Sequence, residues 1–334
     1  MQYPVPYLAI LDVGHGNSTI LRDGDSTIVV DCGSQGSALL EFLTAEGIKS
    51  IDAVFLSHAD QDHIGGLVGL LASDAFEIKR ILLNADATKG SDLWNDLSYE
   101  ISQLNERKQI AVTVGITRRM EDFSCGLLKL EITGPTPYLA AKGVGGLDRN
   151  KDQITSNSIS ASFHVKWKDN VIAYLAGDID QISLNDLVDH KIPLRAPLLV
   201  FPHHGGKPGH LKSNIISFTE KICELIQPST ILFSIGRKKH ENPRTEIVST
   251  IRKKLPKVRV ACTQLSKHCA HALPGASPKH LVSVYAKGRH ARECCGGTFI
   301  VDLTKEPELL PAAPPHVNFI TKEAPTSICL STLD

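Results

Sequence analysis

The chain has 334 residues, enough for one large or two small domains, since a single core stops growing near ~250–300 residues. Its 42% hydrophobic and 22% charged residues are typical of an ordinary soluble globular protein and exclude collagen-like, coiled-coil and disordered classes. The 36 Lys and Arg balance the 36 Asp and Glu, so no basic field covers the whole molecule and any polyanion site must be local.

The first part of the chain alternates short apolar runs with helical patterns, separated by polar turns such as the one at 22–25. In chain order the expected elements are strands at 5–13 and 26–33, a helix at 37–47, a strand at 51–58, a helix at 64–73, a strand at 81–84, a helix at 91–108 and a strand at 109–116.

The second part repeats this alternation. The expected elements are strands at 127–135, 158–167 and 171–178, a helix at 180–190, a strand at 196–204, a helix at 213–227 and a strand at 229–236. Strands mixed with helices, with polar residues where strands end, predict an α/β fold whose site lies along one sheet edge.

The last part of the chain differs in composition, with five prolines in the 30 residues of 305–334. We therefore expect a main domain over 1–304 and a Pro-rich peripheral tail over 305–334 in extended conformation. No run reaches the roughly 18–20 apolar residues of a membrane span, and the N-terminus passes into a strand without a charged leader. A cytoplasmic location without membrane contact is the expectation.

The densest group of potential metal ligands follows the apolar run at 51–57. His58, Asp60, Asp62 and His63 fall within six residues, and we expect them in a loop that the next two residues, Gly65 and Gly66, allow to turn tightly. Carboxylates beside imidazoles suit divalent Zn or Mn. The alternative is a solvated polar loop whose aspartate caps the helix.

Two later strands also end in ionisable residues. Asp178 closes the strand at 171–178, and His203 and His204 close the strand at 196–204, ahead of two glycines. One such residue alone is as often a cap or an ion-pair partner as a metal ligand. Three strand ends with this property favour a common metal site.

The order of these motifs carries a resemblance. Asp12-Val-Gly-His-Gly, Asp31-Cys-Gly, the His58 to Gly66 segment, Gly177-Asp178 and Pro202-His-His-Gly resemble the metallo-β-lactamase fold family over about residues 5 to 265. More narrowly, they are similar to the soluble hydrolase domain of the ComEC family, bacterial proteins of DNA uptake. The resemblance implies an αββα sandwich of two mixed sheets flanked by helices.

The resemblance also implies two divalent metal ions, Zn or Mn. The ligands that it implies are His58 and Asp60 for the first ion, Asp62, His63 and His203 for the second, and Asp178 as a bridge. The first ion then lacks one histidine; Asp148 or Asp152 could replace it, whereas His164 is expected to pack in its strand. An oxygen-rich first site favours Mn.

Other residues are given supporting or catalytic roles by the same resemblance. Asp62 can orient a hydroxide, while Asp12 and Asp31 orient ligands or serve only as turn carboxylates. Because consecutive side chains diverge, His204 is left free for the substrate phosphate or the leaving group, or is a supporting histidine. His240 falls where the relatives have a His-Pro motif and is expected to replace its histidine.

Two further clusters are predicted. A basic loop, with Arg237, Lys238, Lys239 and Arg244, is the best local candidate for phosphate binding, unless it is simply solvated. A Cys/His-rich segment over 262–297 could close a structural Zn site through Cys269, Cys294, Cys295 and either Cys262 or His271. Buried free thiols and disulfides are the alternatives.

These features predict a metal-dependent hydrolase, a phosphodiesterase or nuclease whose substrate is nucleic acid, with DNA favoured by the resemblance. A hydrolase of another ester, a thioester or a small cyclic nucleotide phosphodiester is an alternative, because one fold hosts many chemistries. A binding protein that retains its metal site without catalysis is a third.

Overall fold

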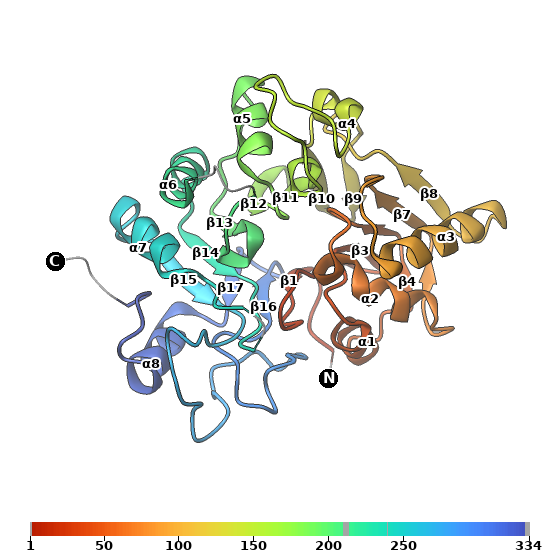
Figure 1. Cartoon of the computed structure of the whole chain (residues 1–334). Coiled ribbons are helices and arrows are strands. Elements are labelled where there is room, and N and C mark those ends of the chain that lie inside the picture. Colours follow the sequence, from red (N-terminus) through yellow and green to blue (C-terminus); the bar gives the residue numbers. More distant parts are fainter. Residues whose placement is uncertain (1, 210–213, 239, 331–334) are drawn as a thin grey trace.

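Two large β-sheets stack face to face in the computed structural model, which describes residues 2–209, 214–238 and 240–330. Helices cover the outer face of each sheet, so the layers follow the order αββα (Figure 1). The sheets are mixed, with parallel and antiparallel pairs in each. The predicted αββα sandwich is therefore confirmed.

The first sheet has the strand order β17-β16-β1-β2-β3-β5-β7-β8. Its strands are β1 (Tyr7–Ile10), β2 (Thr19–Asp23), β3 (Ser26–Val30), β5 (Ala53–Phe55), β7 (Arg80–Leu83), β8 (Ala111–Val114), β16 (Phe299–Asp302) and β17 (Glu308–Leu310). A separate small pair consists of β4 (Ser50–Ile51) and β6 (Glu77–Ile78).

The second sheet has the order β15-β14-β13-β12-β11-β10-β9. Its strands are β9 (Phe123–Cys125), β10 (Leu128–Gly134), β11 (Ser162–Trp167), β12 (Asn170–Leu175), β13 (Leu198–Val200), β14 (Thr230–Phe233) and β15 (Arg259–Cys262). The helices are α1 (Gly36–Ala45), α2 (Gln61–Leu71), α3 (Asp92–Glu106), α4 (Pro137–Lys142), α5 (Gln181–Asp189), α6 (Ile215–Ile226), α7 (Thr245–Lys254) and α8 (Ala313–Glu323), with short 3-10 turns at Asn157–Ile159 and Pro202–Gly205.

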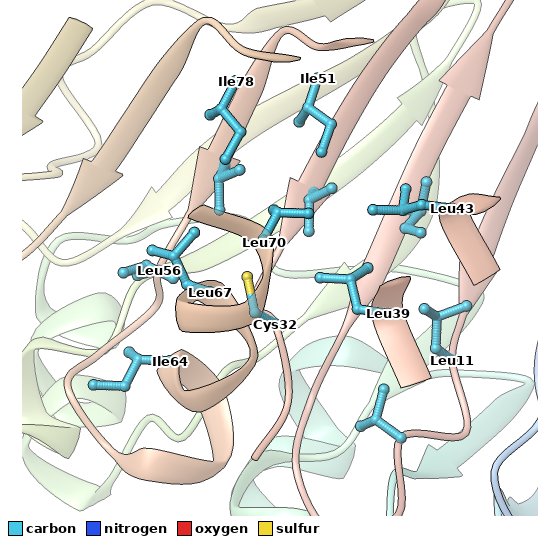
Figure 2. Close-up of a cluster of buried hydrophobic side chains, with 14 of the residues drawn as sticks. Leu11, Cys32, Leu39, Leu43, Ile51, Leu56, Ile64, Leu67, Leu70 and Ile78 are labelled. Carbon is cyan, nitrogen blue, oxygen red and sulfur yellow. The ribbon is translucent and has the colours of Figure 1, made fainter. Parts of the chain in front are cut away.

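Three apolar layers hold this sandwich together. Between the sheets, residues such as Phe55 and Phe163 are fully buried against each other's sheet. Outside the first sheet, α1 and α2 pack their leucines against the strands, and Figure 2 shows Leu39, Leu67 and Leu70 in this layer. Outside the second sheet, α5 to α8 form the matching layer. Burial of these side chains is the main stabilising term of the fold.

The opening of the chain differs from the sequence prediction. The sequence predicts two strands joined at 22–25, whereas the structure has three, with β2 paired to both β1 and β3. The hairpin between β2 and β3 turns at Gly24, whose φ is +57°. β2 ends in Arg22 and Asp23, so its charged end resembles a turn in the sequence although it continues the ladder.

The predicted extended tail is also wrong. β17 pairs with β16 at the edge of the first sheet, and α8 buries Ile320 in the layer outside the second sheet. The prolines stand where regular structure tolerates them, because Pro314 lies in the first turn of α8 and Pro311 follows an edge strand. Within the described residues, no helix combines the length and apolar character needed to cross a bilayer.

The topology brings polar strand ends together. β3, β5 and β7 run parallel in the first sheet, and β12, β13 and β14 run parallel in the second. The carboxyl ends of parallel strands meet at one edge of a sheet, where α/β proteins form their sites. The segments after β5, β12 and β13 carry the predicted ligands at this edge, and the segment after β3 carries Asp31, which was predicted to support them.

Candidate metal centre

The segment after β5 contributes ligands from both a loop and a helix. The sequence predicts that the helix starts near residue 64, but α2 begins at Gln61, so Asp62 and His63 occupy its first turn. Gly66 therefore lies inside the helix rather than in a turn. A Cβ at Gly66 would approach the Cys32 carbonyl oxygen to 1.9 Å, so this glycine lets α2 pack directly against the loop after β3.

One donor group gathers around Asp178. His58, His63 and Asp178 offer donor atoms within 4.8 Å of one another, and all three are buried. The Nε2 atom of His63 lies 3.4 Å from Asp178 Oδ1, and that of His58 lies 3.9 Å from Asp178 Oδ2. The sequence prediction assigns His58 to the first ion and His63 to the second, with Asp178 between them, whereas in the structure both histidines fall in one group with Asp178.

Asp31 and Ser57 contact the Nδ1 atoms of these imidazoles, on the side away from Asp178. The Nδ1 atom of His63 lies 2.7 Å from Asp31 Oδ2, while Asp31 accepts hydrogen bonds from the backbone N–H and hydroxyl of Ser57. The Ser57 hydroxyl also lies 3.0 Å from His58 Nδ1. Contacts of this kind fix ring orientation and tautomer, so the supporting role predicted for Asp31 fits its position.

A second donor group contains a residue to which the sequence analysis assigned no role. His15, Asp62 and His204 also offer donor atoms within 4.8 Å, and Asp62 Oδ2 lies 3.2 Å from the Nε2 atom of each histidine. Gly16 brings the first loop this close, because its φ is +129° and a Cβ there would approach the Asp62 carbonyl oxygen to 2.2 Å. The glycines on both sides of His15 were the signal available in the sequence.

The sequence prediction assigns a metal to His203 and leaves its neighbour His204 free, whereas His204 is the one that joins a three-donor group in the structure. His204 Nε2 lies 3.8 Å from Asp178 Oδ2 and contacts Asp62, whereas His203 Nε2 is 3.1 Å from the carbonyl of Ile179. His203 still contacts Asp178, with Nδ1 3.5 Å from Oδ2 and its backbone N–H donating to Oδ1. Both residues have positive φ, 52° and 55°, and this strained turn directs the ring of His204 toward Asp62.

The donor set fits divalent cations. Among the described residues, the buried Nε2 atoms of His58, His63 and His204 have no hydrogen-bond partner. Buried polar atoms are normally satisfied, so three imidazole nitrogens that form no hydrogen bond and face carboxylates fit the binding of positive ions. Burial alone would raise the pKa of Asp178, but His63, His204 and His203 hold that pKa well below its ordinary value.

Asp60 lies at the edge of the first group. Its Oδ2 is 3.5 Å from His58 Nε2, and its Oδ1 forms an ion pair with Lys89. Burial would raise the pKa of Asp60, but the contacts with His58 and Lys89 lower it. The carboxylate therefore stays ionised and close to the first group, with Lys89 offsetting part of its charge.

The candidates for the missing ligand do not reach the centre. Asp148 accepts hydrogen bonds from the backbone N–H groups of Asn150 and Asp152, within their own exposed loop. His164 is buried on β11 with Nδ1 3.1 Å from Glu131, as expected of a packed histidine. Neither Asp148 nor Asp152 joins a three-donor group among the residues that the structure describes.

Asp12 braces the first loop rather than a ligand. Its buried carboxylate accepts hydrogen bonds from the backbone N–H groups of Gly14 and Gly288 and from the side-chain amide of Gln264. These bonds tie the loop that carries His15 to the C-terminal part of the chain. Burial raises the pKa of Asp12 even though these bonds favour its charged form.

The basic loop is only partly available for phosphate. Arg237 is buried and its guanidinium donates to the carbonyls of four residues, Leu265, Ser266, Ala270 and His271. Its predicted phosphate role is therefore wrong, because its donors are already used. Lys238 is exposed and pairs with Glu293, Arg244 pairs with Glu246, and Lys239 lies outside the described residues.

A pocket of about 320 Å³ opens beside the second donor group. His15, Gln61, Lys238 and Lys287 are among its lining residues, and the aliphatic part of Lys287 lies against Gly14. His240 is exposed near the same rim, with its ring centroid 4.3 Å from that of His15. The pocket thus joins the donor groups to basic side chains at the surface.

The structure also brings together a different set of cysteines from the one predicted to bind a structural zinc ion. All eight cysteines are free. Cys294 turns away from the other candidates, with its Sγ 3.4 Å from Asp12 Oδ2. Cys262, Cys269 and Cys295 instead share a cavity with Cys329, so a set that includes Cys294 is wrong.

Comparison with known proteins identifies the family. The model of the metallo-beta-lactamase superfamily matches residues 11–212. The chain belongs to this superfamily. Its members are mostly hydrolases, and both His/Asp groups lie within the matched region.

A curated relative supports the narrower resemblance. ComE operon protein 3 of Bacillus subtilis (strain 168) is 24% identical over 219 residues, which cover 64% of this chain and 24% of that protein. The chain thus spans about a quarter of that relative's length.

Similar solved structures include the metallo-beta-lactamase fold protein YhfI from Bacillus subtilis, with a TM-score of 0.46 and 15% identity over 77% of this chain and 96% of that chain. Unliganded yeast PDE1 has a TM-score of 0.49 and 13% identity over 78% of this chain and 98% of that chain.

Proposed function

We propose that this protein is a metal-dependent phosphodiesterase that cleaves nucleic acid, with DNA as its substrate. The observation that carries the proposal is the pair of adjacent donor groups, with three buried imidazole Nε2 atoms unsatisfied around Asp178. The similarity to ComE operon protein 3 and the motif resemblance to hydrolase domains of DNA-uptake proteins direct the choice of substrate.

The ligands that we propose are the two groups themselves. His58, His63 and Asp178 would hold one ion and His15, Asp62 and His204 the other, with Asp60 beside the first. The ions would lower the pKa of a bound water and offset charge on the attacking and leaving oxygens. The mixed carboxylate and imidazole donors suit Zn or Mn, and the three carboxylates favour Mn.

Asp62 is the residue that we assign to orienting the attacking water. Its carboxylate is anchored by His15 and His204 but remains partly exposed, at 19% of the side chain. Burial would raise the pKa of Asp62, yet the imidazoles of His15 and His204, each with Nε2 3.2 Å from Oδ2, lower it. The ionised carboxylate can therefore accept a hydrogen bond from a water in the pocket.

His240 and the pocket lysines complete the proposal. His240 is exposed at the rim and, when protonated, can donate a proton to the leaving oxygen. Lys238 and Lys287 line the pocket and can contact phosphates on either side of the cleaved bond. Contacts to phosphate position a strand without reading its sequence.

The decisive experiment is an activity panel with the purified chain. Single-stranded DNA, duplex DNA, RNA and a cyclic dinucleotide are incubated with Mn²⁺ or Zn²⁺, beside a carboxylic ester and a thioester. We expect cleavage of DNA, loss of that cleavage in Asp62→Asn, and wild-type cleavage in Asp169→Asn, whose carboxylate is 79% exposed and pairs with Lys129. Cleavage of the ester or thioester alone would overturn the proposal, and so would cleavage that survives Asp62→Asn.

A further inference from the structure

A second group of potential ligands lies in a cavity away from the pocket described above. Four cysteine side chains line it, and they come from β15, the loop after it, the segment before β16 and the turn after α8: Cys262, Cys269, Cys295 and Cys329. The apolar residues Val260, Leu265 and Ile320 close its walls. The cavity thus joins the second sheet to the C-terminal end of the described chain.

The four cysteines line the same cavity without converging on one point. All four belong to its lining, and no three of their sulfurs lie within 4.8 Å of one another. Cys262 and Cys295 are buried, and the other two are half-buried. None of the four is in a disulfide.

The size and lining of the cavity restrict what can occupy it. Its volume of about 20 Å³ is the space of one water molecule or one ion. A buried water needs two to four polar partners, whereas the surface that faces this cavity is almost entirely apolar. Soft thiolate ligands select Zn²⁺ over hard cations such as Mn²⁺ and Mg²⁺.

We propose that this cavity binds one structural Zn²⁺ ion through four thiolates, those of Cys262, Cys269, Cys295 and Cys329. Each thiol releases its proton to solvent as its sulfur binds zinc, so binding couples to pH and to folding. No three of these sulfurs lie within 4.8 Å of one another in the described chain, whereas a tetrahedral site with Zn–S near 2.3 Å requires about 3.8 Å. Binding therefore draws the four side chains inward by rotation into the cavity.

The neighbouring contacts fit a closed structural site. The Nε2 atom of His316, on α8, lies 3.2 Å from Cys295 Sγ and can support that thiolate from outside. The carbonyls of Ala270 and His271, next to Cys269, accept the hydrogen bonds of Arg237. Zinc would thus fix both the turn after α8 and the loop that holds Arg237, at a distance from the reacting groups.

The test begins with the unaltered full chain loaded with Co²⁺ in place of zinc. Thiolate ligation gives Co²⁺ a sulfur-to-metal charge-transfer band, which the His/Asp groups cannot produce. We expect this band, with about one equivalent of Co²⁺ bound through sulfur per chain. Absence of the band in the folded wild-type chain overturns the proposal, whether or not the protein cleaves DNA.

Matched variants locate the site. Cys329→Ser should remove the charge-transfer band and about one equivalent of tightly bound zinc, and should lower the melting temperature. Cys294→Ser is the control, because Cys294 belongs to the same segment but faces Asp12. Equal zinc content in the two variants, or a Cys269–Cys329 disulfide in protein purified under reducing conditions, contradicts the proposal. Activity of the His/Asp centre, measured on the same samples, reports separately on the proposed function.

Discussion

The His/Asp centre and the four-thiol cavity differ in ligand type, access and sequence spacing. The first offers imidazoles and carboxylates beside an open pocket of about 320 Å³, whereas the second offers thiols around an enclosed space of about 20 Å³. An open site with hard donors leaves room for substrate, while a closed site with four soft donors leaves none. On the two proposals, the first region would perform chemistry and the second would stabilise the fold.

The largest effect is expected from replacing Asp178, which residues of both donor groups approach. Asp178→Asn should lower kcat by about 10²–10³-fold or more, because one preorganised charge at the reacting centre is lost. Metal analysis should show loss of the ions of the His/Asp centre while the sulfur-bound ion remains. Retention of more than half of the kcat would place the chemistry elsewhere, and Asp169→Asn serves as the control.

His15 and His240 allow a buried residue that anchors Asp62 to be compared with an exposed residue at the rim of the pocket. His15 is buried against Asp62, whereas His240 is exposed and contacts the ring of His15. His15→Gln should reduce metal affinity and activity by roughly 10–100-fold. His240→Gln should leave metal content unchanged and alter mainly the pH profile of kcat. Equal loss of metal in both variants would contradict these assignments.

Arg237 tests whether the basic loop is structural. Arg237→Ala leaves four backbone carbonyls without their donor, so we expect a loss of unfolding free energy of roughly 3 kcal/mol. Lys238→Ala, at a side chain that is 80% exposed, should change stability by less than about 0.5 kcal/mol. Urea unfolding of the two variants measures the difference, and similar midpoints would show that the carbonyl contacts contribute little.

The smallest expected effect concerns Lys287 in the pocket. Lys287→Ala should weaken binding of single-stranded DNA and reduce the slope of log K against log salt by about 0.7, the value for one phosphate contact. Binding is measured over a salt series with Asp62→Asn as the background, so that substrate is not consumed. Lys322→Ala, 82% exposed on α8, is the control, and an identical slope in both variants would exclude Lys287 from the substrate path.

Local patterns in the sequence determined the α/β class, the family and most of the first donor group. His58 and His63 are close in the chain, and a strand end followed directly by a helix brings such residues together without help from the rest of the fold. The same holds for Asp178, because a buried strand presents its last polar residue at the sheet edge. The sequence predicted the start of α2 at Gln61 and the charged end of β2 less exactly. β2 continues through Arg22 because that residue pairs with β3.

Only the tertiary structure decided contacts between segments far apart in the chain. His15 reaches Asp62 because Gly16 lets the first loop approach the backbone at the start of α2 closely. A strained turn brings His204 rather than His203 to the Asp62 carboxylate. Arg237 loses its surface role, and Cys329 gains a place beside the other thiols, because the C-terminal part folds back over the second sheet. Residue type and spacing specify which donors exist, whereas long-range packing determines which of them share a site.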